Sequence, residues 1–438
     1  MKVLVIDSDG SSLDFCLRAK EAGHDVRLFV CTKKGGEARC VGEGWIHRID
    51  NWRGSMPWAD LIFLTGNDRY MSELEPFRKK GFPIFSPGVQ GARLEIDRAF
   101  GQKLLKMAGV PCIPYTEFNE YDDAMKFVAK SGKRYVSKTL GDEEDKSLSY
   151  VSKSPEDMIF MLDRWKRLGK NIGRFMLQEF VPGVEIGVSG WFGPGGWSEY
   201  KNENFEHKKL MNGDKGVNTG EMGTVMKYVK DSKLFKDALE PVTDYLHSID
   251  YVGDIDMNCM VDSKGTAWPL EFTCRPGWPA FRIMQACHKG DPVQWMVDLI
   301  NGENTLKVNS DVAIGVVMAQ PDFPYSNATG KEVTGIPVFG MDDVPRNSIS
   351  PADMMMGKVA SMKNGRITQV EMPVTCGDYV IVCTGTGATV SKAKEAAYKI
   401  VDKISFPNSP MYRTDIGDRL EKQLPLLQKH GYATEFVF

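Results

Sequence analysis

The chain opens with two apolar strand patterns that are joined through a turn and a stretch of helical character. Residues 2–6 form the first pattern and residues 25–30 the second. Two strands connected through a helix run parallel, because a parallel pair needs a crossover that a tight hairpin does not provide. Further short apolar runs at 61–64 and 83–85 continue the pattern. The sequence therefore predicts an open parallel α/β sheet over residues 1–93.

The turn after the first predicted strand is a candidate binding loop. Open parallel sheets bind ligands at the carboxyl ends of their strands, and this turn and residues 65–68 both occupy that position. We therefore take Asp9, Gly10 and Ser11 as candidate substrate-binding residues. In the alternative interpretation, which has equal weight on this pattern alone, Asp9 and Gly10 only provide the geometry of a turn.

Beyond residue 93 the pattern changes to a charged amphipathic helix at 94–108, which ends at a Gly-Val-Pro sequence at 109–111. Glycine favours the end of a helix and proline prevents its continuation, so a new unit begins there. The sequence contains no internal repeat or low-complexity linker. We expect further strands at 135–138, 150–153, 175–180, 183–189, 255–261, 268–273, 312–318, 357–362 and 379–384, and helices at 155–168 and 391–404.

Composition limits the class of protein. With 438 residues the chain is too long for one ordinary core, and 42% hydrophobic with 26% charged residues is typical of a globular enzyme. The formal charge of -3 gives no general attraction to a nucleic-acid backbone or an anionic membrane. Nine cysteines without a CxxC pair argue against a disulfide framework or a zinc site. Without a signal sequence or an apolar run of about 18 residues, the chain is expected to be cytoplasmic and not membrane-bound.

The sharpest polar pattern lies on two predicted strands that a short turn connects. Asp254, Asp256 and Asn258 alternate along the first strand, and Glu271 and Thr273 along the second, so each set faces one side. Carboxylate, amide and hydroxyl oxygens suit Mg²⁺, with Mn²⁺ as an alternative ion, rather than zinc. The predicted metal ligands are Asp256, Asn258, Glu271 and Thr273. The alternative is simply the polar face of a half-exposed hairpin.

Lysines and carboxylates on neighbouring loops suit a nucleotide. Lys138 ends a predicted strand beside a glycine-containing loop, and Lys146 lies eight positions later, so that both cations could meet a polyphosphate. Gln178, Glu179 and Glu185 surround a strand end and a turn, where side-chain oxygens accept hydrogen bonds from adenine or ribose. For each of these residues the alternative is a solvated position on a loop.

His207 and Lys208 precede a Gly/Asp-rich stretch that is typical of an ordered binding loop. Of the six histidines only His207 has such neighbours, so we include it, with Lys208, among the candidate catalytic residues. No Ser/His/Asp or Cys/His arrangement is evident in the sequence. The candidate substrate residues of this stretch are Asn218, Thr219, Gly220 and Glu221.

In order along the chain, these motifs resemble the phosphoribosylamine-glycine ligase (glycinamide ribonucleotide synthetase) family of the ATP-grasp superfamily over essentially the whole length. The collinear segments are 85–87, 94–95, 109–111, 178–180, 207–209, 218–223, 271–275, 315–317, 333–335 and 412–417, with Lys138, Gly141 and Lys146. The resemblance implies an α/β, multidomain ATP-grasp fold with an N-terminal open parallel sheet domain and a small, mostly β C-terminal domain. The implied domains are 1–93 for substrate, 94–190 for the ATP-grasp subdomain with the lid, 191–305 for the metal and catalytic subdomain, and 306–438 at the C-terminus.

The resemblance also implies a chemistry. Lys138 would contact ATP phosphate, Glu179 and Glu185 would hold adenine and ribose, and Glu271 would coordinate Mg²⁺. Arg275 would lie beside an acyl phosphate formed from an amino acid, which an amine then attacks. A divalent ion, a lysine and an arginine together neutralise the charge of phosphoryl transfer. The implied cofactors are ATP and Mg²⁺, and the implied partners are a small amino acid and an amine, bound by a monomer or a homodimer.

Several positions on the substrate side depart from the family pattern. Ser11, Ser12 and Leu13 stand where the family has an arginine, a glutamate and a histidine. Four carboxylates at 142–145 occupy the loop that should lie over the ATP phosphates, where they would repel a polyanion. Further replacements are Thr273 for an asparagine, Glu221 for a glycine, and Trp278 and Ala280 for acidic residues.

Three functions therefore stay open on the sequence. The first is a ligase that joins glycine or a similar small amino acid to an amine, with release of ADP and phosphate. The second is a ligase for a different acceptor amine, for instance on a modified nucleoside, a nucleobase or a nucleic acid. The third is a nucleotide-binding relative that has lost catalysis. Measuring ADP release with a panel of amines separates the three.

Overall fold

The N-terminal segment is a five-stranded sheet in the order β3-β2-β1-β4-β5, in which every neighbouring pair is parallel. The computed structural model in which it is seen describes residues 1–32, 39–140, 149–170, 173–325, 330–408 and 410–438. The elements of this segment are β1 (Lys2–Asp7), α1 (Leu13–Glu21), β2 (Asp25–Val30), β3 (His47–Arg48), the 3-10 helix η1 (Arg53–Trp58), β4 (Leu61–Leu64), α2 (Met71–Arg78) and β5 (Ile84–Phe85). The open parallel α/β sheet that the sequence predicts is confirmed.

Two helices, α3 (Gly88–Ile96) and α4 (Arg98–Met107), follow this sheet. The single helix predicted at 94–108 is therefore wrong. Asp97 leaves the helical conformation, and its side chain accepts a hydrogen bond from the backbone N–H of Phe100 at 3.0 Å. A short carboxylate that caps a new helix competes with continuation of the preceding one, which explains the break.

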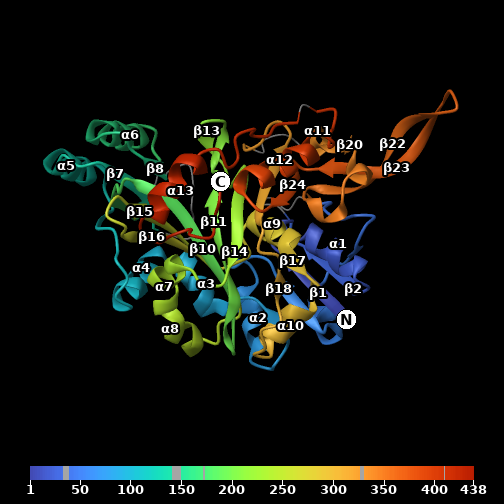
Figure 1. The fold of residues 1–438 in the computed structure, drawn as a ribbon, viewed down its shortest axis with the longest axis horizontal. Helices are drawn as coiled ribbons and strands as arrows, with labels where there is room; N and C mark the ends of the chain where they lie inside the picture. The colour runs from blue at the N-terminus through green and yellow to red at the C-terminus, as the bar shows by residue number, and fades with distance from the viewer. Residues whose placement is uncertain (33–38, 141–148, 171–172, 326–329, 409) are drawn as a thin grey trace.

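A four-stranded sheet in the order β6-β9-β7-β8 comes next, and α5 and α6 cover one face of it (Figure 1). Its elements are β6 (Tyr115–Phe118), α5 (Tyr121–Ser131), β7 (Tyr135–Thr139), β8 (Tyr150–Val151), α6 (Pro155–Arg167) and β9 (Phe175–Glu179). Ser154 caps α6 through its side chain, and proline occupies the first turn, where its missing N–H costs nothing. This unit has a small apolar core of its own.

The largest element is an eight-stranded sheet in the order β16-β15-β10-β11-β14-β19-β24-β21. Its strands are β10 (Gly183–Gly193), β11 (Gly196–Glu206), β14 (Gly223–Val229), β15 (Gly253–Asp262), β16 (Ala267–Thr273), β19 (Val312–Ala319), β21 (Ile349–Pro351) and β24 (Tyr379–Gly387). The sheet runs across two of the domain limits expected from the sequence, since β10 passes residue 190 and β19 lies beyond residue 305. The four domains stay a prediction, and the catalytic and C-terminal segments share one sheet and one core.

Helices and short sheets surround this large sheet, and the hairpin of β22 and β23 projects from the body (Figure 1). The remaining strands are β12 (Lys209–Met211), β13 (Lys215–Asn218), β17 (His288–Lys289), β18 (Lys307–Val308), β20 (Thr334–Pro337), β22 (Met354–Lys363) and β23 (Arg366–Cys376). The helices are α7 (Lys233–Ala238), α8 (Thr243–Ser248), α9 (Ala280–Cys287), α10 (Gln294–Ile300), α11 (Gly330–Val333), α12 (Val390–Val401), α13 (Leu420–Gln428) and three 3-10 turns, η3 (Glu240–Val242), η4 (Met341–Asp343) and η5 (Arg346–Ser348). Within the described residues, no helix has the length and apolar character needed to cross a membrane.

Candidate active site

The loop after β1 is organised around the buried carboxylate of Asp7. Hydroxyl groups of Ser12 and Thr65 donate to this carboxylate. Burial alone would raise the pKa of Asp7, but the hydrogen bonds from Ser12 and its neighbours outweigh burial and hold the pKa below its usual value. Four backbone N–H groups also donate to it, from Asp9 (3.2 Å), Gly10 (2.9 Å), Ser11 (3.0 Å) and Ser12 (2.8 Å). These amides, which the sequence suggests for substrate, thus hold an anion of the chain itself.

A cation reaches the same loop from a distant part of the chain. Gly10 has a φ of +90°, and a Cβ atom at this position would lie 3.9 Å from Nη1 of Arg39. Nε of Arg39 is buried without a hydrogen-bond partner among the described residues. The sequence gives no local signal for this approach, because Arg39 lies between β2 and β3.

Arg275 follows β16 and lies where the large sheet meets the N-terminal sheet. Its Nη2 atom is 3.3 Å from Oε1 of Glu95 at the end of α3, and Asn67 donates to the other carboxylate oxygen at 2.7 Å. The charge of Glu95, with a contribution from Asp9, raises the pKa of Arg275. The structure thus brings two predicted site residues, Arg275 and Asp9, near one another and pairs Arg275 with Glu95, which the sequence analysis did not name as a site residue.

The hairpin of β15 and β16 pairs the four predicted metal ligands directly, Asp256 with Thr273 and Asn258 with Glu271. Directly opposed residues of an antiparallel pair share a face, so all four side chains lie on one side of the sheet. Glu271 also forms a 3.1 Å ion pair with Arg98 of α4. No group of three or more His, Cys, Asp and Glu residues that could hold a metal occurs in the described part of the chain. The roles of these four residues as Mg²⁺ ligands stay a prediction.

Glu206, at the end of β11, connects the hairpin of β15 and β16 to Lys208. It accepts a hydrogen bond from Asn258 at 3.2 Å and forms a 3.0 Å ion pair with Lys208, which also contacts Glu185 at 2.7 Å. Burial alone would lower the pKa of Lys208, but the charges of Glu206 and Glu185 raise it well above its usual value. Glu206 was missed because nothing in the polar sequence of 202–206 separates a ligand from an ordinary strand residue.

Asp256 is the buried acid of this cluster. Burial raises its pKa to about 8, and the charge of Glu206 adds to that effect, while a 2.9 Å hydrogen bond from Asn204 opposes it. Gly187 on β10 makes room for this packing, since a Cβ atom there would collide with side-chain oxygens of Asn204 and Asn258. A cation bound beside Asp256 would therefore displace a proton near neutral pH.

Lys138 lies at the meeting point of the four-stranded and eight-stranded sheets. Its ammonium group donates to the backbone carbonyl of Leu270 on β16 at 3.3 Å. Burial lowers its pKa to about 8, partly offset by the nearby charge of Glu271. The structure thus brings Lys138 to the predicted metal ligands. Lys146 and the acidic residues 142–145 lie outside the residues that the structure describes.

The predicted adenine and ribose residues lie on β9 and β10. Gln178 is buried within β9, and Glu179 at its end forms a 2.7 Å ion pair with Lys133. Glu185 on β10 contacts Lys208 instead. Glu179 and Glu185 thus belong to different ion pairs. Of the two, only Glu185 is linked to the hairpin of β15 and β16 by the contacts between described residues, through Lys208 and Glu206. Their nucleotide roles stay a prediction.

His207 does not suit the catalytic role predicted for it. Its ring is fully buried, and its Nε2 atom accepts a hydrogen bond from the backbone N–H of Gly417 at 3.2 Å. Burial, assisted by the positive charge of Arg419, lowers the pKa of His207 to about 3. A histidine that stays neutral at physiological pH and holds a backbone loop is a positioning residue rather than an acid or a base.

The predicted substrate loop separates into exposed and buried parts. Asn218 and Gly220 are exposed, whereas the hydroxyl of Thr219 donates to the backbone carbonyl of Lys208 at 2.8 Å. Glu221 is buried, and its Oε1 atom has no hydrogen-bond partner in the described residues. Burial, with the charge of Glu206, raises the pKa of Glu221 well above its usual value.

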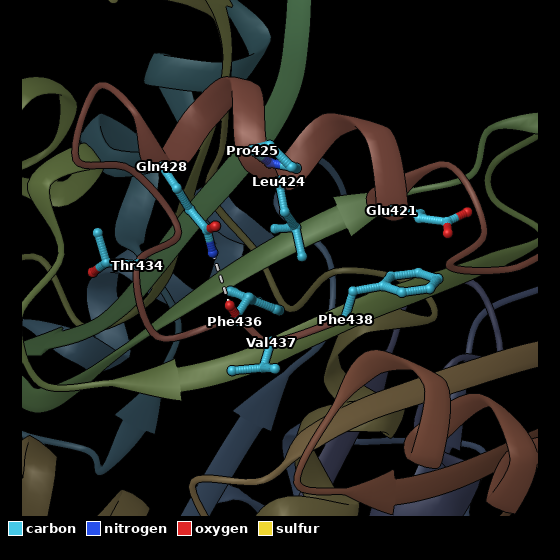
Figure 2. A pocket seen from close by; sticks show the side chains of 8 residues that line it. All are labelled: Glu421, Leu424, Pro425, Gln428, Thr434, Phe436, Val437 and Phe438. Atoms are coloured by element: carbon cyan, nitrogen blue, oxygen red, sulfur yellow. Dashed lines mark hydrogen bonds between the residues drawn. The ribbon is translucent and has the colours of Figure 1, made fainter.

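A surface hollow between α13 and the last residues of the chain lies apart from these groups (Figure 2). Within it, Gln428 donates to the backbone carbonyl of Phe436 at 2.8 Å. Most of its lining is apolar, and Glu421 is its one titratable side chain. The hollow contains none of the residues predicted for catalysis.

Comparison with known proteins identifies the architecture. The family model described as "Phosphoribosylglycinamide synthetase, ATP-grasp (A) domain" matches residues 96–280, and "Phosphoribosylglycinamide synthetase, C domain" matches residues 313–419. The chain belongs to this family. It is 29% identical to a phosphoribosylamine-glycine ligase of Ralstonia nicotianae over 443 aligned positions, which cover 96% of this chain and 99% of the relative. The family assignment makes the chain an ATP-grasp ligase, an ATP-dependent enzyme that forms a C–N bond.

Solved structures agree on the fold of this family member. A phosphoribosylamine-glycine ligase from Thermotoga maritima superposes with a TM-score of 0.69 at 20% identity, covering 95% of this chain and all of that one. An N5-carboxyaminoimidazole synthetase from Staphylococcus aureus in complex with ADP gives a TM-score of 0.56 at 13% identity, covering 92% and 97% of the two chains. The ATP-grasp fold implied by the motifs is therefore confirmed.

Proposed function

We propose that this ligase activates the carboxylate of glycine or a similar small amino acid as an acyl phosphate and joins it to an amine other than phosphoribosylamine. The observation that carries the proposal is the loop after β1. Its backbone amides at Gly10, Ser11 and Ser12 donate to Asp7, so they are not available to a substrate phosphate. A phosphate group usually binds to free backbone N–H groups or to an arginine.

The charge of the loop acts in the same direction. Asp7 is ionised at neutral pH, because its hydrogen bonds hold its pKa below the ordinary value, so a phosphate dianion would meet repulsion there. Arg39 reaches Gly10, but a single guanidinium lacks the array of amides that complements a phosphate. The loop itself favours a neutral or cationic part of the acceptor, such as a protonated amine or sugar hydroxyls, and does not offer a site for the phosphate that phosphoribosylamine would bring to it.

The nucleotide side supports ATP-dependent activation. Lys138 and Lys208 supply two cations beside the oxygen-bearing hairpin, and Glu271, Asn258 and Asp256 would hold Mg²⁺ together with the ATP phosphates. When bound, the ion would neutralise charge on the transferred phosphoryl group. These residue roles are part of the proposal.

Arg275 would stabilise the acyl phosphate on the other side. It points toward the N-terminal sheet through its contact with Glu95, and a guanidinium binds two phosphate or carboxylate oxygens at once. Its position between the hairpin and the loop of Asp9 suits a group that meets both the activated carboxylate and the incoming amine.

The test is steady-state ADP release with glycine and a panel of amines, including freshly generated phosphoribosylamine. We expect ADP release to depend on an amino acid, and phosphoribosylamine to be a poor acceptor compared with another amine. A kcat/KM of about 10⁴ M⁻¹s⁻¹ or more for phosphoribosylamine with glycine would contradict the proposal for the acceptor. ATP binding without any amino-acid-dependent turnover would indicate a relative that has lost catalysis.

A further inference from the structure

Arg282, in the first turn of α9, is a buried arginine whose guanidinium group makes no hydrogen bond to the described residues. Its side chain is 2% exposed, and none of its three guanidinium nitrogens has a hydrogen-bond partner among the described residues. Buried polar groups are almost always hydrogen-bonded, and an unpaired buried charge is costly. An arginine that leaves every donor unused in a buried position therefore indicates a ligand with acceptor oxygens.

The surroundings of Arg282 are aromatic and carry further unused donors. Its Cζ atom lies 5.5 Å from the ring centroid of Trp278 and 5.9 Å from that of Tyr379, and the two rings stack with centroids 3.7 Å apart. The indole N–H of Trp278 and the hydroxyl of Tyr379 are also buried without hydrogen-bond partners in the described part of the chain. Three neighbouring side chains thus have unmade hydrogen bonds at one place.

A neighbouring acid, Asp353, does not satisfy these donors. Burial raises the pKa of Asp353, and the charges of Arg282 and Arg39 both act to lower it. Its Oδ2 atom accepts a hydrogen bond from the backbone N–H of Tyr379 at 3.2 Å. Asp353 forms no hydrogen bond with Arg282. All three guanidinium nitrogens of Arg282, and Nε of Arg39, therefore keep donors for an external anion.

This cluster adjoins the predicted substrate residues on two sides. A Cβ atom at Gly220 would lie 4.0 Å from the ring of Trp278, and one at Gly10 would lie 3.9 Å from Arg39. Trp278 also follows Arg275 by three positions in the chain. The position of Arg282 is thus beside the residues proposed for the acceptor.

We propose that Arg282, with Arg39 and the Trp278–Tyr379 pair, forms an oxyanion-binding subsite that recognises a non-reacting phosphate or carboxylate of a substrate. This inference rests on the proposed function, since it assigns part of the same acceptor site. Two sources supply such a group: a phosphate on the acceptor amine, or a side-chain carboxylate on the amino acid. A phosphate on the acceptor would then bind here rather than on the loop of Asp7.

The test uses the whole protein with its nucleotide site filled by a non-hydrolysable ATP analogue and Mg²⁺, so that added phosphate cannot bind there. Thermal unfolding is measured with ribose 5-phosphate, with glutamate and with glycine, each against sodium chloride of equal ionic strength. We expect ribose 5-phosphate or glutamate to raise the unfolding temperature of wild type, as a ligand of the native state does. The phosphate and the dicarboxylate then identify the source of the anion.

Arg282→Met should weaken the binding of the stabilising anion roughly ten- to hundredfold, because charge-assisted hydrogen bonds are lost. Arg282→Lys should keep part of the affinity. Arg413→Met is the matched control, because Arg413 is also 2% exposed but is paired with Asp214 at 2.9 Å and Asp415 at 2.8 Å. We expect Arg413→Met to lower the unfolding temperature of the ligand-free protein by several degrees, and Arg282→Met to leave it unchanged or raise it.

Two results would overturn the proposal. One is no stabilisation of wild type by either oxyanion beyond the sodium chloride control. The other is equal stabilisation of wild type and Arg282→Met. Stabilisation by the ATP analogue itself, measured in the same series, reports on the nucleotide half of the proposed function and does not depend on Arg282, so the two ideas fail separately.

Discussion

Replacing Asp7 by asparagine tests the role of the buried carboxylate in the first loop. Asparagine keeps one acceptor oxygen, so the hydrogen bonds at Oδ1 from Gly10 and Ser11 can survive. The two hydrogen bonds that Ser12 donates to Oδ2 are lost, because an NH₂ group would then face those donors. At roughly 1.5 kcal/mol for each hydrogen bond to a charged group, we expect a loss of about 3 kcal/mol in the free energy of unfolding.

The pH dependence follows from the direction of the pKa shift. The pKa of Asp7 is lower in the folded protein than its ordinary value of 3.8, since hydrogen bonds from Ser12 and neighbouring amides outweigh the effect of burial. The stability that the charge provides is therefore complete above about pH 4 and is lost as the pH falls through the folded pKa. The difference between wild type and Asp7→Asn should be full at pH 7 and shrink in strong acid.

Urea unfolding followed by circular dichroism, with hydrogen exchange at the amides of Gly10 to Ser12, measures both effects. Asp9→Asn is the matched control in the same loop, because the side chain of Asp9 accepts a single 3.2 Å hydrogen bond from the amide of Ser11. It should change the free energy of unfolding by less than about 1 kcal/mol. Equal stability of Asp7→Asn and wild type at pH 7, or unchanged exchange of the loop amides, would refute the reasoning.

Three further predictions concern the nucleotide half of the site. The affinity for ATP with Mg²⁺, measured by calorimetry, should be constant up to about pH 8 and fall about tenfold per pH unit above it. The reason is that burial lowers the pKa of Lys138 to about 8, and only its charged form attracts phosphate. An affinity that stays constant to pH 10 would exclude a contact between Lys138 and phosphate. Glu271→Ala should weaken the binding of Mg²⁺-ATP at least roughly tenfold, because a carboxylate ligand is lost. An unchanged affinity would show that Glu271 is not a metal ligand. Arg275→Ala should bind ATP normally but lose most turnover in an ADP-release assay, because the acyl phosphate that Arg275 would contact develops its charge only during the reaction. Wild-type turnover at saturating substrate would make Arg275 a structural residue.

The periodic parts of the fold were accessible from the sequence, because buried strands and amphipathic helices leave a local pattern. The β1–α1–β2 opening, the hairpin of Asp256 and Glu271, and the helix after Ser154 each have such a pattern and a turn signal. The strand β11 was missed because polar side chains at 202–204 are buried in it, whereas a polar stretch of sequence suggests an exposed segment.

Residues whose importance arises from distant contacts could not be predicted. Glu95 meets Arg275 across 180 positions of chain, and nothing near it in sequence distinguishes it from another helical glutamate. The unused donors of Arg282 are visible only when every neighbour is in place. Likewise, Ser11 is a candidate substrate residue on the sequence, but the sequence does not show which acceptor its amide meets, and in the structure the amides of Ser11 and Ser12 both donate to Asp7.

The shared eight-stranded sheet also has consequences for how the chain is made. The four-stranded unit is built from the continuous segment 115–179 and has its own core, so it can fold while the rest of the chain is still being synthesised. The large sheet is different, because the edge of β14 (Gly223–Val229) is covered only when β19 has been made, and the edge of β19 only when β24 has been made. Until about residue 387 has left the ribosome, a partly apolar edge stays open to pairing with other chains. The hairpin of β15 and β16 lies at the opposite end of this sheet, so its pairing with β10 does not wait for β24.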